Sequence, residues 1–189
     1  PDVDADIYLP PAAIDDSLSG ATGVTLLTGG AGFFGIHFLQ SLMQRSDRQF
    51  VLLVRGKDQQ TIKAKFAAAV GSFDLMETID LSRITFLRGD LSQQRLGLDD
   101  ESYDWASREI DTIVHIGSHV NNWLPYEGIR EINVTGTRTL LTLARTGRKK
   151  AFHYTSTCTF LPQKDDNSVF LETDTIDKAS INRYFGYDL

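Results

Sequence analysis

The sequence predicts an α/β fold built on a doubly wound parallel sheet. Short apolar runs, typical of buried parallel strands, alternate along the chain with helical patterns. A glycine-rich turn joins the first of these runs to the first helix. The chain has 189 residues, which is enough for one such domain with a sizeable core.

The composition argues against several classes of function. A net charge of −6 disfavours non-specific binding to nucleic acid. Cys158 is the one cysteine and the four histidines lack metal-ligand spacing, so we expect neither a disulfide framework nor a metal site. No apolar run approaches the roughly 20 residues of a transmembrane helix, and the N-terminus lacks a signal-peptide pattern. We therefore expect a cytoplasmic protein.

The stretch VTLLTGGAGFFG at residues 24–35 predicts a Rossmann-type dinucleotide site. Gly29 permits a tight turn, Gly32 lets the backbone approach a pyrophosphate, and Gly35 lets the helix pack closely on the sheet. The new helix also presents free N–H groups and its positive dipole end to the phosphates. The residues of this turn expected to contact the cofactor are Thr28, Gly29, Gly32, Phe33, Phe34 and Gly35.

The end of the second predicted strand, residues 50–54, indicates the cofactor. Enzymes that bind NAD usually place an acidic residue about 20 residues past the glycines, where it holds the ribose 2′-hydroxyl. Here Arg55 follows the strand, and Lys57 is close to it. A cation suits the 2′-phosphate of NADPH, and the arginine fork can bind it bidentately. We interpret Arg55 and Lys57 as NADPH ligands. The alternative is that Arg55 is a solvated arginine at the end of a strand. The nearby acid Asp58 argues weakly against NADPH, but it lies beyond the strand end.

Three further strands are predicted at residues 83–88, 111–116 and 151–157, and helices at 59–70, 100–109 and 125–145. Cofactors bind at the carboxyl ends of such strands. We therefore expect contacts from Asp90 and its neighbour Leu91, and from Gly117 and Ser118, whose small size lets a cofactor pass closely. For Asp90, a helix cap or turn aspartate is an equally good interpretation.

Other polar residues suggest structural roles. Asn133 lies on an otherwise apolar helix face and would tie that helix to the neighbouring strands. The basic cluster Arg145, Arg148, Lys149 and Lys150 follows a helix end, where cations are favoured, although it could also bind an acidic partner. Residues 1–20 are interpreted as an N-terminal arm and residues 21–189 as the nucleotide-binding domain.

The five strands give a doubly wound sheet of probable order 3-2-1-4-5. The chain resembles an extended short-chain dehydrogenase/reductase, and more narrowly the thioester reductase domains of nonribosomal peptide synthetases, carboxylic acid reductases and aminoadipate reductases. The resemblance covers nearly the whole chain. It rests on VTLLTGGAGFFGIHFLQSL, LLVRGKD, FLRGDLSQQRLGL, DTIVHIGSHVNNWLPYEGIREINVTGTRTLLTLA, FHYTSTCTF, the final GY and the lead-in DADIYLPPAAI. The stretch Ile116-Gly117-Ser118 departs from the family's commoner Asn-Ala-Ala type.

The resemblance implies that Thr157 and Tyr187 are catalytic, with Tyr187 in a Tyr-x-x-x-Lys pair whose lysine would fall two residues past Leu189. It implies hydride transfer from NADPH to an acyl or peptidyl thioester on the phosphopantetheine arm of a carrier protein. The product would be an aldehyde, or an alcohol in some relatives.

Complete domains of this kind are longer. We therefore expect the chain as given to stop before the substrate-binding part, to be inactive alone and still to bind NADPH weakly. Two alternatives remain: a sugar-nucleotide epimerase or dehydratase on the same fold, and a non-enzymatic NADP-binding module.

Overall fold

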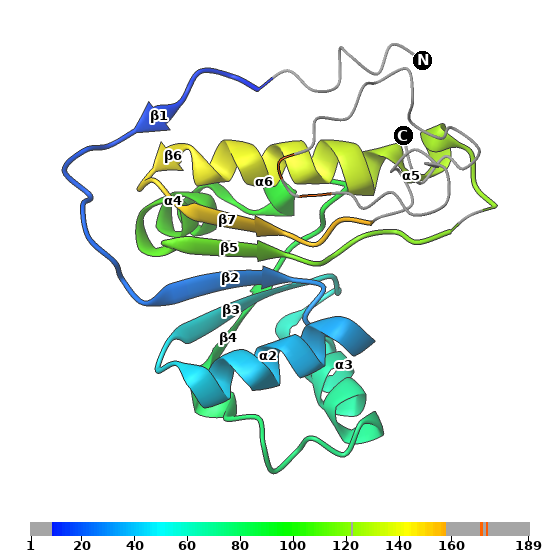
Figure 1. Cartoon of the computed structure of the whole chain (residues 1–189). Helices are drawn as coiled ribbons and strands as arrows, with labels where there is room; N and C mark the ends of the chain where they lie inside the picture. The colour runs from blue at the N-terminus through cyan, green and yellow to red at the C-terminus, as the bar shows by residue number, and fades with distance from the viewer. Residues whose placement is uncertain (1–8, 122, 158–170, 172, 174–189) are drawn as a thin grey trace.

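The computed structural model describes residues 9–121, 123–157, 171 and 173. Its centre is a five-stranded parallel sheet with the spatial order β4-β3-β2-β5-β7 (Figure 1). The strands are β2 (Val24–Thr28), β3 (Gln49–Val54), β4 (Ile84–Arg88), β5 (Thr112–His115) and β7 (Ala151–Tyr154). Numbered along the chain, this order is 3-2-1-4-5, which confirms the predicted topology.

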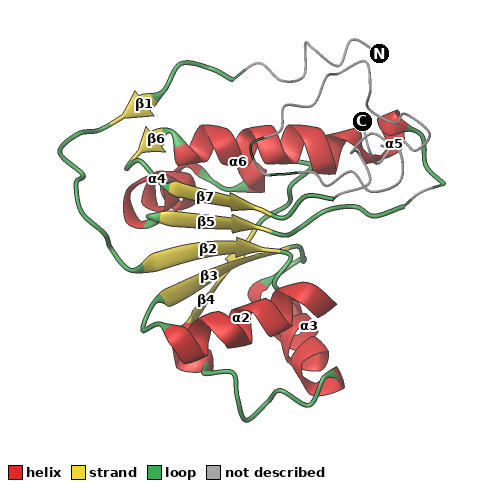
Figure 2. Cartoon of the chain, viewed as in Figure 1, coloured by secondary structure: helices red, strands yellow, loops and turns green. Residues whose placement is uncertain are grey.

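Helices cover both faces of the sheet (Figure 2). The helices α2 (Phe33–Arg45) and α3 (Gln59–Ser72) pack on one face, and α4 (Asp100–Glu109) and α6 (Gly136–Ala144) on the other. Short 3-10 turns lie at Leu81–Arg83 and Gln94–Gly97. Within the described part of the chain, no helix combines the length and the apolar character needed to cross a membrane.

Each face of the sheet has its own apolar core. Leu27 and Leu52 belong to the core under α2 and α3, whereas Leu26 and Val51 belong to the core under α4 and α6. Because side chains of a strand alternate between faces, a strand covered on both sides must be apolar throughout. This requirement explains the continuous apolar runs of β2 and β3 in the sequence.

The predicted helix over residues 125–145 contains an irregular turn. It divides into α5 (Tyr126–Arg130), a π-helical turn at Glu131–Thr135, and α6. Gly136 donates its N–H to the carbonyl of Glu131, five residues back, which is the π-type bond. Such single π turns often occur near functional sites, and this one faces the carboxyl edge of the sheet.

The fifth strand ends at Tyr154 and is therefore shorter than the predicted range 151–157. Tyr154 pairs with His115, the last residue of β5, and Thr155 N then donates to His115 O at 3.0 Å. Beyond that bond the chain that follows β5 donates its N–H groups at Ile116 and Gly117 to Thr28 Oγ1, so the regular ladder between the two strands ends there.

The N-terminal arm is attached to the domain near the amino edge of the sheet. The two-residue strand β1 (Ala13–Ile14) pairs in parallel with β6 (Thr146–Gly147). Arg148 donates to the carbonyl of Leu18 at 2.9 Å, and the buried ammonium of Lys150 donates to Ser107 O at 2.8 Å. These two members of the basic cluster therefore bind backbone carbonyls, in keeping with a structural role.

A partly buried ion pair joins three strands at the same edge. The guanidinium of Arg48 contacts the carboxylate of Asp111 and donates to Thr25 Oγ1 at 2.7 Å. Asp111 also accepts from Gly23 N at 2.8 Å and from Thr112 Oγ1 at 2.8 Å. Burial raises the pKa of Asp111, but these hydrogen bonds and the Arg48 charge outweigh it, so the pKa is lowered.

Replacing this carboxylate should destabilise the fold. We expect Asp111→Asn to lower the free energy of unfolding at pH 7 by about 2 kcal/mol, because Arg48 loses a charged partner. The lowered pKa stabilises the folded state above the unfolded value of about 3.9 and ceases to do so as the pH falls through the folded value.

Urea denaturation between pH 7 and pH 3 measures both effects. The matched control is Asp104→Asn, which removes an exposed helical ion pair with Arg108 and should change stability by less than about 0.5 kcal/mol. Equal losses in the two variants would contradict the structural role assigned to Asp111.

Candidate functional site

A cleft of about 210 Å³ opens at the carboxyl edge of the sheet. The ends of β2, β3, β4 and β5 supply most of its wall, as expected for an open α/β sheet. Its lining residues are Thr28, Gly29, Leu53, Arg55, Gly89, Asp90, Leu91, Gly117, Ser118 and Ile132. Seven of the predicted cofactor-binding residues are therefore brought together: Thr28, Gly29, Arg55, Asp90, Leu91, Gly117 and Ser118.

The sequence interpretation missed three lining residues, Leu53, Gly89 and Ile132. Leu53 and Gly89 lie within two residues of Arg55 and Asp90. Their positions at the ends of predicted strands could therefore have indicated that they line the cleft. Ile132 reaches the cleft from the π turn, far along the chain. Its apolar pattern indicated only an inward helix face, because periodicity does not tell which inward residues face a cleft rather than a core.

The glycine turn packs closely against its neighbours and leaves the start of α2 without a side-chain cap. Gly29 has φ +72°, and a Cβ on it would lie 2.7 Å from Gly117 N. A Cβ on Gly35 would overlap the carbonyl of Gly29. Gly32 caps α2 without a side chain, so no side-chain acceptor meets the first-turn N–H groups. Backbone donors at the open end of a helix are suited to a pyrophosphate.

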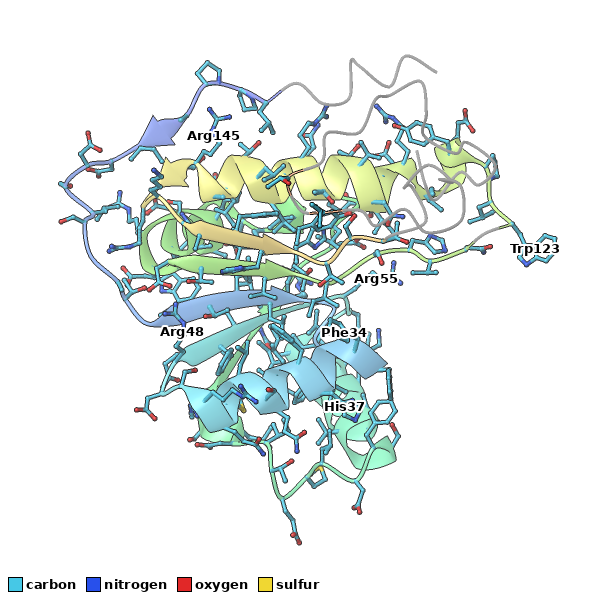
Figure 3. The ribbon with its side chains drawn as sticks, in the orientation of Figure 1. Phe34, His37, Arg48, Arg55, Trp123 and Arg145 are labelled. Atoms are coloured by element: carbon cyan, nitrogen blue, oxygen red, sulfur yellow. The ribbon has the colours of Figure 1, made fainter. Side chains whose placement is uncertain are left out.

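The remaining predicted residues of this region lie outside the cleft wall. Phe33 is 67% exposed and its ring packs against His37 and Phe73. Phe34 is 52% exposed and packs against Phe38. Figure 3 shows Phe34, His37 and Arg55 toward the carboxyl end of the sheet, and Arg48 at the other end.

Arg55 lies in the cleft with an exposed side chain and takes part in none of the ion pairs between described residues. The acid in the same turn and the acid in the same cleft wall bind backbone N–H groups instead. Asp58 caps α3 by accepting from Thr61 N at 2.7 Å, and this hydrogen bond lowers the pKa of Asp58. Asp90 accepts from Ser92 N at 2.9 Å, which is turn-aspartate geometry within the cleft wall.

The hydroxyl of Thr28 joins the two central strands beneath the cleft. Thr28 Oγ1 accepts from the N–H groups of Ile116 at 3.2 Å and Gly117 at 3.0 Å. It also lies 2.7 Å from His115 Nδ1. Thr28 is 1% exposed. Its hydroxyl therefore holds the Gly117 backbone against the glycine turn.

This network determines the tautomer of His115. Both lone pairs of Thr28 Oγ1 accept hydrogen bonds from N–H groups. The hydroxyl therefore donates its own hydrogen bond to His115 Nδ1. The imidazole therefore carries its N–H at Nε2, which donates to Thr137 Oγ1 at 2.9 Å. The Thr137 hydroxyl donates in turn to the carbonyl of Asn133 at 2.6 Å. Burial lowers the pKa of His115 to about 4. The ring is therefore neutral at pH 7.

Asn133 connects the π turn to the loop that leaves β5. Its Oδ1 accepts from His119 N at 2.7 Å and its Nδ2 donates to His119 O at 3.0 Å. The structural tie expected from the sequence exists, but it reaches this loop rather than a strand. It holds the loop that carries Gly117 and Ser118.

Of the two predicted catalytic residues, Thr157 alone falls within the part of the chain that the structure describes. Thr157 is half-buried just after β7, outside the cleft wall. Tyr187, Cys158 and Thr159 lie outside the described residues, so the catalytic assignment stays a prediction.

The state of His115 gives a pH prediction. Its pKa of about 4 lies below the ordinary 6.5, so the unfolded chain binds more protons between these values and stability falls as the pH is lowered through this window. We expect this group to lower the free energy of unfolding by about 2 kcal/mol between pH 7 and pH 5.

Urea denaturation measures the stability, and ¹⁵N NMR of the imidazole reports the protonation of His115 directly. The ring should remain the neutral Nε2–H tautomer down to pH 5.5. An imidazolium signal at pH 6 would contradict the hydrogen-bond assignment.

Comparisons with known proteins agree on one family. Residues 27–184 match the NAD-binding family model described as Male sterility protein. The nonribosomal peptide synthetase asaC of Aspergillus flavus is 38% identical over 143 residues, which are 75% of this chain and 14% of that protein. The L-2-aminoadipate reductase large subunit of Eremothecium gossypii is 30% identical over 153 residues, 77% of this chain and 11% of that protein.

Among solved structures, the terminal R domain from the myxalamid PKS-NRPS biosynthetic pathway superposes with a TM-score of 0.85 at 34% identity. The match covers 98% of this chain and 48% of that one. The chain therefore spans only part of the relatives that it matches. Since the family model covers most of the sequence and this superposition covers nearly all of it, the chain belongs to the NAD-binding reductase domains that terminate nonribosomal peptide synthetases, within the extended short-chain dehydrogenase/reductase superfamily.

Proposed function

We propose that this chain is the NADPH-binding part of an oxidoreductase that releases a phosphopantetheine-bound acyl or peptidyl thioester as an aldehyde, or further as an alcohol. The observation that carries the cofactor assignment is the exposed guanidinium of Arg55 in the cleft. Family membership, and the similarity to an L-2-aminoadipate reductase, support the reductive chemistry.

The cleft, the glycine turn and the turn at residues 55–58 together fit this cofactor. Gly29, Gly32 and Gly35 clear a path for a pyrophosphate, and the first turn of α2 offers N–H donors to it. Arg55, with Lys57, binds the 2′-phosphate through charge and a planar fork of donors. Gly117 and Ser118 line the passage on the β5 side, and Asp90 with Leu91 lines it next to β4.

The reaction places a developing negative charge on the thioester carbonyl oxygen, which hydrogen-bond donors must stabilise. When bound, NADPH supplies the hydride. Tyr187 donates the proton and Thr157 donates a hydrogen bond to the same oxygen. Tyrosine has an ordinary pKa of about 10, so a lysine cation beside it would be needed to lower that value toward neutrality.

The substrate arrives on a carrier protein. The family resemblance implies this partner, which would present the acyl or peptidyl group covalently as a phosphopantetheine thioester. The matched nonribosomal peptide synthetases support it, since this chain corresponds to a small share of their length.

We expect Arg55→Ala to weaken NADPH binding about tenfold or more, because a charged hydrogen bond is worth about 1.5–3 kcal/mol, and to leave NADH binding nearly unchanged. Calorimetric titration of both cofactors measures the effect. Lys149→Ala, an exposed cation near the opposite edge of the sheet, is the control and should change neither affinity. Equal losses for NADPH and NADH in Arg55→Ala would refute the cofactor preference.

Removing the proposed proton donor should abolish turnover and leave cofactor binding intact. In the protein at its full natural length, Tyr187→Phe should lower kcat for acyl-pantetheine thioester reduction by about 10²–10⁴, and Thr157→Ala should also lower kcat. NADPH oxidation is followed at saturating cofactor. Wild-type turnover in Tyr187→Phe would show that the assignment is wrong, and turnover of a sugar nucleotide instead would favour an epimerase or dehydratase.

A further inference from the structure

The turn at residues 55–58 carries both proposed phosphate-binding cations, and two other cations hold its backbone. Lys65 Nζ, on α3, donates to the carbonyl of Arg55 at 3.0 Å. Arg88 Nη1, at the end of β4, donates to the carbonyl of Lys57 at 3.0 Å. Each residue assigned to the 2′-phosphate thus has its own carbonyl bound by a different neighbouring cation.

The rest of the turn is held from within. A Cβ on Gly56 would lie 2.5 Å from Ile62 Cγ2, so the turn packs directly against α3. Asp58 caps that helix through Thr61 N. Gln59 Nε2 donates to Phe86 O at 3.2 Å, which ties the start of α3 to β4. The backbone of the turn is therefore anchored to both of its neighbours, α3 and β4.

Charge gathers in the same place. Arg55, Lys57, Lys65 and Arg88 all have exposed side chains around this strand end, in a chain whose net charge is −6. Asp58, the acid within the turn, is used as a helix cap.

We propose that Lys65 and Arg88 are positioning residues that determine the preference for NADP(H) over NAD(H). They hold the backbone of residues 55–58 so that the Arg55 fork and the Lys57 ammonium meet the 2′-phosphate without first having to be ordered. This inference rests on the proposed use of NADPH. A cofactor with a free 2′-hydroxyl gains little from the same arrangement, because it offers no charge to the two side chains.

The chain contains a matched control for simple loss of charge. Lys63 lies two residues from Lys65 on the same helix and is likewise exposed. Lys63→Met and Lys65→Met therefore remove the same charge from the same element, but only Lys65 donates to the Arg55 carbonyl among the hydrogen bonds of the described residues. If the hydrogen bond to the Arg55 carbonyl matters, Lys65→Met should weaken NADPH binding more than Lys63→Met does. If only the positive charge of α3 matters, the two variants should weaken it alike.

The experiment compares the dissociation constants of NADPH and NADH by calorimetric titration for the wild type, Arg55→Ala and the positioning variants. We expect Lys65→Met and Arg88→Met each to weaken NADPH binding about three- to tenfold, the range of one hydrogen bond, and to leave NADH binding within twofold. Lys63→Met should change neither constant. Lys65→Arg should restore most of the loss, because it retains a donor at this position.

The outcomes separate this inference from the proposed function. A wild type that binds both cofactors equally would overturn the NADPH assignment, and the inference with it. A wild type that prefers NADPH, loses the preference in Arg55→Ala and keeps it in Lys65→Met and Arg88→Met would overturn the inference alone. So would equal effects of Lys63→Met and Lys65→Met. Thermal unfolding of each variant, expected within a few degrees of wild type for these exposed side chains, confirms that the comparison concerns folded protein.

Discussion

The contact between two backbone segments, at Gly29 and Gly117, is the constraint on which the site depends. A Cβ on Gly29 would lie 2.7 Å from Gly117 N, so the two loops meet without any side chain between them. The buried hydroxyl of Thr28 holds this contact by accepting the Gly117 N–H. The Thr28 hydroxyl in turn donates a hydrogen bond to Nδ1 of the neutral His115 ring. The floor of the cleft is therefore built from satisfied, buried polar groups, which are costly to disturb.

The two edges of the sheet use charge differently. At the amino edge, Arg48 and Asp111 neutralise each other and join the starts of three strands. At the carboxyl edge, the cations around Arg55 bind carbonyls of the protein or lie exposed, and the acid Asp58 caps a helix. Removing one partner of the Arg48–Asp111 pair would leave the other charge uncompensated, whereas an unneutralised cation at a strand end is available to an anionic ligand. This division is consistent with one edge that holds the fold and another that binds a dinucleotide.

Much of the fold could be predicted because its signals are local. Continuous apolar runs mark strands covered on both faces, and the order of strands follows from the right-handed crossover rule. Seven predicted residues of the cleft were brought together because parallel strands bring their carboxyl ends to one edge. The signals failed where a contact between distant segments decides the structure. The end of the fifth strand depends on where the chain that follows β5 leaves it. The π turn at Glu131–Thr135 changes the spacing of apolar residues too little to be recognised from the sequence.

By itself, the sequence determined the sheet, its strand order, the glycine turn and the cation that replaces an acid at the second strand end. These features depend on residue type and spacing along short segments. Only the tertiary structure decided that Thr28 holds Gly117, that His115 is neutral, that Ile132 lines the cleft, and that Lys65 and Arg88 hold the turn of Arg55. Each of these depends on atoms that lie far apart or on different elements along the chain, and such contacts follow from packing in three dimensions and not from periodicity.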